Sequence, residues 1–455
     1  MKLSLKEKIA YGIGAVGKDI VYMFTASYIL YYFENCLGIS AIFTGMLLLG
    51  ARVFDAFNDP LMGVLVARTR SPWGKFRPWI LSGTVLNAAV LIFMFAAPAS
   101  LDQKGLMIWA AVTYVLWGVT YTMMDIPFWS MIPAFTSDPK EREGLSTLGR
   151  TCAGAGSAIA SVLTMMMVMM LGKGDERLGF KLFAIIVAVV FVLSAIFLFV
   201  TIQEKSTVDV ETVSVKEMFK ALIGNDQAMV LVVTIVLVNV SIYITSNLVI
   251  YYFKYDFGGA NWSDAYTLFN TFGGATQILS MMLLYPLVRK FLSMKQVFNL
   301  CVQMAMCGFV VLLILSMVNL KNLYVLFIPG FLIFAANGMI TVLTTVFLAD
   351  SVDYGQMKNG RRDESVIFSM QTFVVKLASG VAALLAALCL EIFHISDSTE
   401  AVAQVSNGSL IGLRLTMTLL PLAGLLFALY YFKTRYLLDE EKMAQIHDAL
   451  GGVQS

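Results

Sequence analysis

Long apolar segments separated by short polar ones dominate the chain. A helix needs about 20 predominantly apolar residues to cross the hydrocarbon core of a membrane, and runs of that length recur about twelve times. They are centred near residues 22, 50, 89, 116, 158, 190, 240, 275, 308, 336, 378 and 420. The pattern predicts an all-α integral membrane protein with twelve transmembrane helices.

The longest polar stretch, residues 203–227, divides these segments into six and six. We therefore expect four parts: a six-helix half at 1–202, a cytoplasmic middle loop at 203–227, a second six-helix half at 228–432 and a cytoplasmic tail at 433–455. Twelve spans in two halves is the plan of the major facilitator fold, in which the substrate site lies near the midplane between the halves.

Composition and charge agree with a membrane location. The chain is 58% hydrophobic and 14% charged, whereas a soluble protein is about 25% charged. Lys and Arg outside the spans number 21 on the side of the N-terminus and 6 on the other, which predicts that both termini are cytoplasmic. The opening MKLSLKEK leads straight into the first span, so no cleavable signal peptide is expected. A net charge of +2 does not suggest nucleic acid, and the five cysteines have no metal-ligand or disulfide spacing.

Several ionisable residues lie inside the apolar segments. Such residues are costly at membrane depth, so each is a functional hypothesis by default. The first half has seven of them and the second half one that stands deep within its span: Lys18, Asp19, Arg52, Asp55, Asp59, Asp125, Arg150 and Lys376. Four acids and four bases form a neutral set, which suits either a transport site or ion pairs that fix helix packing.

Two carboxylates, Asp55 and Asp59, lie one helical turn apart with Asn58 on the same flank. Like charges at this spacing repel, and in a medium of low dielectric they would share a proton unless a cation lies between them. Oxygen ligands of this kind suit hard cations. We interpret the pair as one wall of a cation site in which Arg52 or Lys376 offsets the excess charge. An ion-pair cluster with only a packing role is the alternative.

A second group of residues lies on one face of the fourth span: Trp117, Tyr121, Asp125 and Trp129. A carboxylate that accepts hydrogen bonds from paired hydroxyls, beside an indole plane, is the chemistry that a sugar needs. A cavity lined by aromatic residues with a few polar groups is typical of ligand sites. An interfacial aromatic belt is the alternative for the Trp residues, although it does not explain the carboxylate. Lys18, Asp19 and Arg150 would add donors and an acceptor.

The short loop RTRSPWGKFRPW, residues 68–79, joins spans two and three. Its basic residues suit a cytoplasmic latch that pairs with acids of the other half: Arg68, Arg70, Lys75 and Arg77 on one side, Asp350 and Asp353 on the other. Ordinary positive-inside anchoring explains the same basic residues equally well.

Six stretches of the sequence resemble the glycoside–pentoside–hexuronide:cation symporters, and within that family the sodium-coupled melibiose transporters. They are YGIGAVGKD, RVFDAFNDPLMG, RTRSPWGKFRPWIL, LWGVTYTMMDIPFWSMIP, ADSVDYGQMKNGRRDES and FSMQTFVVK. The resemblance runs from about residue 8 to about residue 437 and covers both halves. It implies the major facilitator fold in a bacterial plasma membrane.

The resemblance also implies site residues. The family's cation site, for Na⁺, corresponds to Asp55, Asn58, Asp59 and Thr122. Its sugar site corresponds to Lys18, Asp19, Trp117, Tyr121, Asp125, Trp129, Arg150, Gln371, Thr372 and Lys376. The chain departs from the melibiose type at Thr341, where that type has Trp, and at Ala26, where it has Tyr, so the shape of the pocket wall and the preferred galactoside are expected to differ.

These features together predict a symporter that couples inward movement of sodium, or of lithium or protons, to uptake of a galactoside such as melibiose. A proton-coupled symporter of another glycoside or pentoside is the first alternative. A sodium-dependent lysolipid transporter fits less well, because the polar residues would make a strongly polar cavity. An intramembrane aspartyl protease is disfavoured, since its two acids must approach from separate positions. We expect a monomer in the lipid bilayer with no enzymatic activity and no organic cofactor.

Overall fold

The computed structural model describes residues 3–135, 139–204, 220, 223–259, 261–359, 364–395 and 405–451. All regular secondary structure in these ranges is helical. Twelve of the helices are long and apolar enough to cross a membrane. The predicted fold class, all-α with twelve transmembrane helices, is confirmed.

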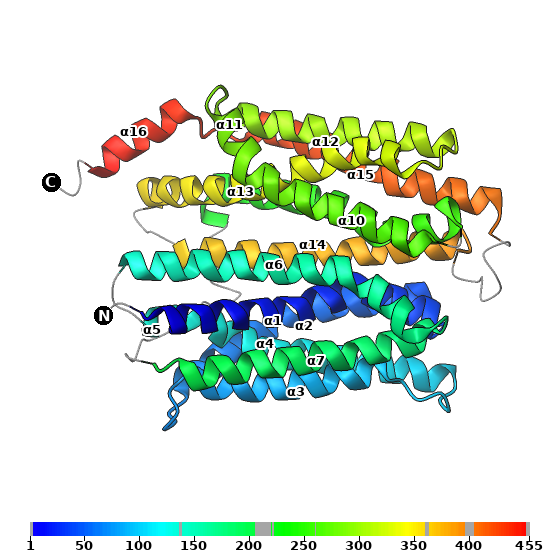
Figure 1. The fold of residues 1–455 in the computed structure, drawn as a ribbon. Coiled ribbons are helices and arrows are strands. Elements are labelled where there is room, and N and C mark those ends of the chain that lie inside the picture. The colour runs from blue at the N-terminus through cyan, green and yellow to red at the C-terminus, as the bar shows by residue number, and fades with distance from the viewer. Residues whose placement is uncertain are drawn as a thin grey trace. The chain divides into compact units, whose positions relative to one another are not determined.

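The chain divides into two compact units, Met1–Thr212 and Val213–Ser455. The helices of the first unit lie side by side (Figure 1). They are α1 (Leu5–Tyr31), η1 (Tyr32–Cys36), α2 (Ala41–Arg68), α3 (Arg77–Phe95), α4 (Gln103–Ser130), α5 (Ile132–Phe135), α6 (Pro139–Gly172) and α7 (Glu176–Thr201). Six of the candidate membrane spans belong to this unit.

The second unit contains the other six candidate spans. Its helices are α9 (Asp226–Tyr251), η2 (Tyr252–Phe257), α10 (Trp262–Leu279), η3 (Ser280–Leu284), α11 (Tyr285–Arg289), α12 (Met294–Met317), α13 (Leu323–Asn359), α14 (Glu364–Ile392), α15 (Asn407–Arg435) and α16 (Glu440–Gly451). Most of the predicted middle loop, at 205–219 and 221–222, lies outside the described residues.

Helix α1 forms the centre of the first unit. It packs against α6 and α7, while α4 packs against α2 and α3. Small residues permit this close approach: a Cβ added at Gly17 would lie 2.1 Å from the Ser194 hydroxyl, and one at Gly156 would lie 2.5 Å from the Val16 carbonyl. Small residues at helix interfaces are the usual means of close packing in membranes. These two contacts hold α1 tightly against α6 and α7.

Helix α2 has its polar face inward and its apolar face outward. Arg52 and Asp55 are 7% and 5% exposed, whereas Phe57 and Leu61 are 60% and 65% exposed. This is the reverse of a soluble helix and is expected where lipid replaces water. The helix therefore directs its charges toward α4, its main neighbour.

The first helix of each unit ends in the same way. The sequence Tyr-Tyr-Phe occurs at 31–33 and at 251–253, and it leads into the π-helical turns η1 and η2. Both turns are followed by a glycine with a φ of +66°, Gly38 and Gly258, a left-handed conformation that other residues rarely adopt. The two ends are an internal repeat, as expected for a transporter built from two related halves.

A buried ion pair closes one end of the second unit. The Asp256 carboxylate of η2 accepts two hydrogen bonds from the Arg414 guanidinium of α15, each 2.6 Å long. Asp256 is 3% exposed and Arg414 is 9% exposed. The same guanidinium lies 3.4 Å from the side-chain oxygen of Asn319, just after α12. Sequence reasoning found only Lys376 deep within a span of this half, because charges near the ends of apolar runs look like loop residues.

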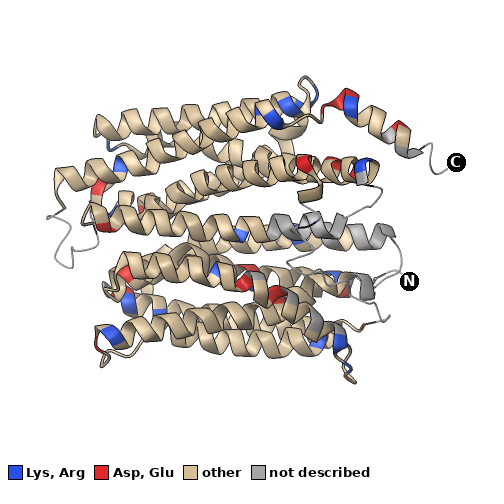
Figure 2. Ribbon diagram, turned by 180° about the vertical axis from the view of Figure 1, so that it is seen from behind, with Lys and Arg blue, Asp and Glu red and all other residues tan. Residues whose placement is uncertain are grey.

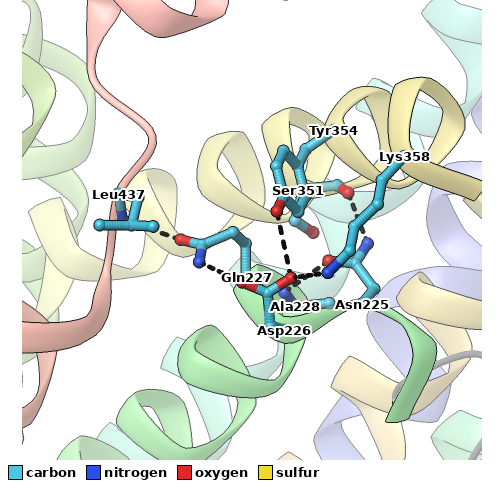
Figure 3. A network of polar contacts seen from close by, with 8 residues as sticks. All are labelled: Asn225, Asp226, Gln227, Ala228, Ser351, Tyr354, Lys358 and Leu437. Carbon is cyan, nitrogen blue, oxygen red and sulfur yellow. Dashed lines mark hydrogen bonds and ion pairs between the residues drawn. The ribbon is translucent and has the colours of Figure 1, made fainter.

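A polar network fixes the start of α9, as Figure 3 shows. Asp226 pairs with Lys358 and accepts a hydrogen bond from the Tyr354 hydroxyl, 3.1 Å away, both from the end of α13. The amide of Asn225 donates to the Ser351 carbonyl at 2.7 Å. The backbone N–H of Leu437, between α15 and α16, donates to the Gln227 side chain at 2.8 Å. These hydrogen bonds and the ion pair therefore hold the start of α9 against α13 and against the segment before α16.

We predict that Arg414→Leu lowers the free energy of unfolding by about 3–5 kcal/mol, because it leaves the Asp256 carboxylate buried without its counter-ion. Denaturant titration of the purified protein in detergent measures this. Arg435→Leu, at the exposed end of the same helix, is the control and should change the value by less than about 0.5 kcal/mol. Equal effects of the two substitutions would contradict a structural role for the pair.

Candidate functional site

The polar residues of the first unit gather midway along its helices. Figure 2 shows acidic and basic positions there, apart from the charged residues at the helix ends. They come from α1, α2, α4 and α6. The contacts among them, described next, lie within the first unit, Met1–Thr212.

Lys18 of α1 is the centre of a three-residue ion cluster. Its ammonium nitrogen lies 2.8 Å from Asp19 Oδ2 and 2.7 Å from Asp125 Oδ1. It is also 3.5 Å from the Tyr121 hydroxyl and 5.0 Å from the centroid of the Trp129 ring. The Lys18 side chain is 4% exposed and that of Asp125 is 27% exposed. One buried ammonium thus holds two carboxylates in place, and both of them remain partly accessible.

Arg150 of α6 adds a second cation beside the same indole. Its guanidinium carbon lies 4.5 Å from the centroid of the Trp129 ring, and its side chain is exposed. Trp129 is therefore flanked by Lys18 and Arg150. The structure brings together all seven sugar-site residues predicted for the first half, which are Lys18, Asp19, Trp117, Tyr121, Asp125, Trp129 and Arg150.

A ladder of aromatic rings runs along α4 next to this cluster. Trp117 stacks on Tyr114, with centroids 5.8 Å apart, and on Tyr121, 5.4 Å apart. Trp117 is 1% exposed, and its indole nitrogen has no hydrogen-bond partner among the residues that the structure describes. A buried N–H without a partner costs about 1–3 kcal/mol of folding free energy. The indole N–H is therefore suited to donate a hydrogen bond to a ligand oxygen.

Asn87 of α3 positions this part of α4, and sequence reasoning missed it. Its side-chain amide donates to the Trp117 carbonyl and to the Thr120 hydroxyl, each at 2.9 Å. Asn87 is fully buried. A lone Asn inside an apolar run indicates a buried hydrogen-bonded residue, and the sequence shows one here. Its partners on another helix cannot be predicted from residue spacing.

The two carboxylates of α2 have different partners. Asp55 Oδ2 lies 3.3 Å from the Arg52 guanidinium, one turn earlier on the same helix. Asp59 accepts a hydrogen bond from the Thr122 hydroxyl of α4, 3.0 Å away. Arg52, one of the two counter-ions proposed from the sequence, therefore contacts Asp55. The separate partners reduce the repulsion expected between the two acids.

Helices α2 and α4 meet in register. A Cβ added at Gly118 would lie 3.3 Å from Asp55 Oδ1, and Gly118 precedes Thr122 by four residues, as Asp55 precedes Asp59. Asp55 thus lies against Gly118 and Asp59 against Thr122. The absence of a side chain at Gly118 leaves room for the Asp55 carboxylate, a role that was not inferred from the sequence although a glycine inside a helix signals close approach.

The side chains of this region that could coordinate a cation through oxygen are the two carboxylates, the Thr122 hydroxyl and the amide of Asn58. Within the described ranges, no three His, Cys, Asp or Glu residues form a metal-binding group, and the oxygen-rich set instead suits a hard cation such as an alkali ion. The Asn58 amide nitrogen has no hydrogen-bond partner among the described residues. Its side chain can therefore reorient to present the amide oxygen to a cation.

The remaining predicted sugar-site residues lie in the second unit. Lys376 is half-buried on α14, and the side chains of Gln371 and Thr372 lie outside those that the structure describes. Thr341, on α13, is exposed and donates a hydrogen bond to the Asn337 carbonyl at 2.8 Å. Ala26 is partly exposed on α1.

The basic loop before α3 has a carboxylate partner within its own unit. Glu204 accepts hydrogen bonds from the backbone N–H groups of Lys75, Phe76 and Arg77, at 2.7, 2.8 and 3.0 Å. An anion at the N-terminus of α3 is favoured by the helix dipole. Sequence reasoning missed Glu204. Of the proposed latch residues, Arg68 and Arg70 are exposed, and Asp350 and Asp353 are half-buried on α13; pairing between them stays a prediction.

Comparison with known proteins gives consistent results. Residues 10–440 match the family described as MFS/sugar transport protein. The raffinose carrier protein of Pediococcus pentosaceus is 29% identical in an alignment of 461 positions that covers 96% of this chain and 70% of that protein. The inner membrane symporter YicJ of Escherichia coli (strain K12) is 30% identical over 375 residues, 82% of this chain and 80% of that protein.

The fold also matches a solved transporter structure. A bacterial homologue of the human lysosomal transporter Spinster has a TM-score of 0.69 and covers 97% of each chain at 13% sequence identity. This likeness supports the fold alone.

We predict that Lys18→Met and Asp125→Asn are not additive. Lys18→Met leaves Asp125 without its cation, and Asp125→Asn leaves Lys18 with Asp19 as its remaining carboxylate, whereas the double variant removes both partners of the 2.7 Å ion pair. A double-mutant cycle on the free energy of unfolding in detergent should give an interaction energy of about 0.5–3 kcal/mol. Lys6→Met, at an exposed position of the same helix, replaces Lys18→Met in the control cycle. An additive result for Lys18 and Asp125 would show that the pair does not form.

Proposed function

The chain belongs to the MFS/sugar transport proteins, a family of membrane transporters and not of enzymes, and it is a cation-coupled sugar symporter. From this premise we propose that sodium is the coupling ion, with lithium or protons as substitutes, and that the sugar is a galactoside such as melibiose. Alternating access then moves both solutes inward across the bacterial plasma membrane.

The observation that carries the proposal is the pair of adjacent residues Tyr121 and Thr122. The Tyr121 hydroxyl lies 3.5 Å from Lys18 in the ion cluster, and the Thr122 hydroxyl donates to Asp59. Neighbouring residues on a helix point about 100° apart, so one turn of α4 contributes to two sites. A ligand at either site restrains the same turn, which is what coupled transport requires.

The cation site in this proposal consists of Asp55, Asn58, Asp59 and Thr122. Their oxygens form the hard ligand set that sodium prefers. A bound cation also stabilises the two ionised carboxylates of α2 against each other. Because α2 and α4 contribute opposite walls, cation binding orders both helices. By linkage, a cation that raises sugar affinity must itself be bound more tightly when sugar is present.

The sugar site in this proposal uses charged groups to bind hydroxyls and aromatic rings to bind the apolar face of the sugar. Asp19 and Asp125 are the hydrogen-bond acceptors, Lys18 and Arg150 are donors, and Trp129 is the stacking surface. The partial exposure of Asp125 leaves a carboxylate available to a ligand. The relative named as a raffinose carrier supports a sugar substrate, and the polar lining disfavours a lysolipid.

The second unit completes the proposed sugar site with Gln371, Thr372 and Lys376 of α14. Thr341 and Ala26 are smaller than the residues of the melibiose type, so we expect them to set which galactoside fits. We also propose that both termini and the loop of residues 68–77 face the cytoplasm, with Arg68, Arg70, Lys75 and Arg77 opposite Asp350 and Asp353 as a latch.

We predict that Asp59→Cys abolishes the stimulation of sugar uptake by sodium while sugar binding persists. The substitution removes the carboxylate that accepts the Thr122 hydrogen bond and contacts the cation, but it leaves the Lys18 cluster intact. Uptake of labelled melibiose into proteoliposomes and calorimetric sugar binding measure the two properties. Asp264→Cys, at an exposed position of α10, should behave as the unmodified protein. Sodium stimulation that survives Asp59→Cys would disprove the cation-site assignment.

We predict that Asp125→Ala weakens galactoside binding on the order of 10²-fold, because a charged acceptor contributes about 1.5–3 kcal/mol to a hydrogen bond. Isothermal titration calorimetry with melibiose measures the loss. Sodium binding in the absence of sugar should change by less than about threefold, which separates a local effect from misfolding. Unchanged melibiose affinity would place the sugar elsewhere.

A further inference from the structure

Tyr22 lies between the two proposed sites and belongs to neither predicted residue set. It is half-buried on α1, four residues after Lys18, and therefore on the same helix face. Its ring centroid is 5.4 Å from that of Tyr121 and 6.3 Å from that of Trp117. Tyr22 thus packs on the aromatic ladder of α4.

The same ring faces the charged pair of α2. The Arg52 guanidinium carbon lies 5.9 Å from the Tyr22 centroid, within the range of a cation–π contact. Arg52 is 7% exposed, so the contact is desolvated. Its guanidinium also lies 3.3 Å from Asp55. Arg52 therefore contacts a proposed cation ligand and an aromatic ring that packs on the sugar site.

A small cavity adjoins these groups. It has a volume of about 10 Å³ and is lined by Arg52, Asp55, Tyr114, Trp117 and Gly118, among others. A space of this size holds at most about one water molecule. Since packed interiors respond to a displaced side chain by discrete rearrangement, a shift of Arg52 relative to Asp55 must be accommodated by the neighbouring rings.

We propose that Tyr22 is the residue that couples the cation site to the sugar site, an inference that rests on the function proposed above. Without a bound cation, Arg52 is the counter-ion of the Asp55 carboxylate. A cation that binds Asp55 and Asp59 competes with it, and the displaced guanidinium shifts onto the Tyr22 ring. Tyr22 transmits the shift to Trp117 and Tyr121 by stacking. It is a positioning residue, not a ligand of either solute.

The test compares two dissociation constants of melibiose, with and without saturating sodium, by calorimetry on the purified protein in detergent. Their ratio is the coupling factor, which for linked sites is about 5–150-fold. We expect Tyr22→Phe, which keeps the ring, to retain the factor of the unmodified protein within about twofold. Tyr22→Leu and Tyr22→Met, which remove the ring, should reduce the factor to about one, while the sodium-free affinity changes less than about threefold.

Tyr430→Leu is a control at a tyrosine of α15 that is 66% exposed, and it should leave the coupling factor unchanged. Tyr22→Met serves as a second variant without the ring, so that the test stands if Tyr22→Leu does not fold. Rescue of the factor by Tyr22→Phe separates coupling through the ring from general damage to the helix.

The outcomes distinguish this inference from the function on which it rests. Loss of the factor in a ring-free variant, with retention in Tyr22→Phe, supports the role of Tyr22. Retention of the factor in every Tyr22 variant overturns it and leaves the sodium–galactoside symport intact. A coupling factor of one in the unmodified protein overturns the proposed function, and the inference with it.

Discussion

The cost of an unpaired charge inside a membrane determines the arrangement of the first unit. Lys18 lies between Asp19 and Asp125, and Arg52 lies beside Asp55. Hydrocarbon offers no substitute for these partners, so the Lys18–Asp125 pair fixes how α1 and α4 meet. The hydrogen bond from Thr122 to Asp59 joins α2 to α4. These groups, together with Asn58, Asp59, Thr122 and Arg150, have the polarity to replace the hydration of a cation or a sugar. Stability and binding therefore depend on one set of contacts.

Helix α4 connects the two kinds of binding. Its register with α2, where Gly118 faces Asp55 and Thr122 faces Asp59, defines the oxygen-rich region. Its aromatic face, with Trp117 and Tyr121, defines the other region. Because both belong to the same helical turns, a change at one alters the packing at the other. This physical link, to which the Tyr22 ring packed on Trp117 and Tyr121 belongs, is the basis of the coupling proposed above.

Much of this architecture could be predicted from the sequence, for identifiable reasons. Twelve apolar runs predict twelve membrane helices, and the motifs predict the sugar-transport family, both of which are confirmed. The i, i+4 spacing of Asp55 and Asp59 correctly places them on one face. Contacts between distant parts of the chain could not be predicted. Three contacts each join segments whose approach depends on packing, which the spacing of residues does not encode. They are those of Asn87 (α3) with α4, of Glu204 with the backbone at the start of α3, and of Asp256 with Arg414.

The most direct test of the central claim is uptake of labelled melibiose into proteoliposomes that contain the purified protein, at fixed pH, with and without an inward sodium gradient. The account predicts accumulation above the external concentration only when the gradient is present. Accumulation that ignores sodium and follows a pH gradient would contradict sodium coupling and make Asp55 and Asp59 a proton site. The absence of melibiose uptake under either gradient would contradict the proposed substrate.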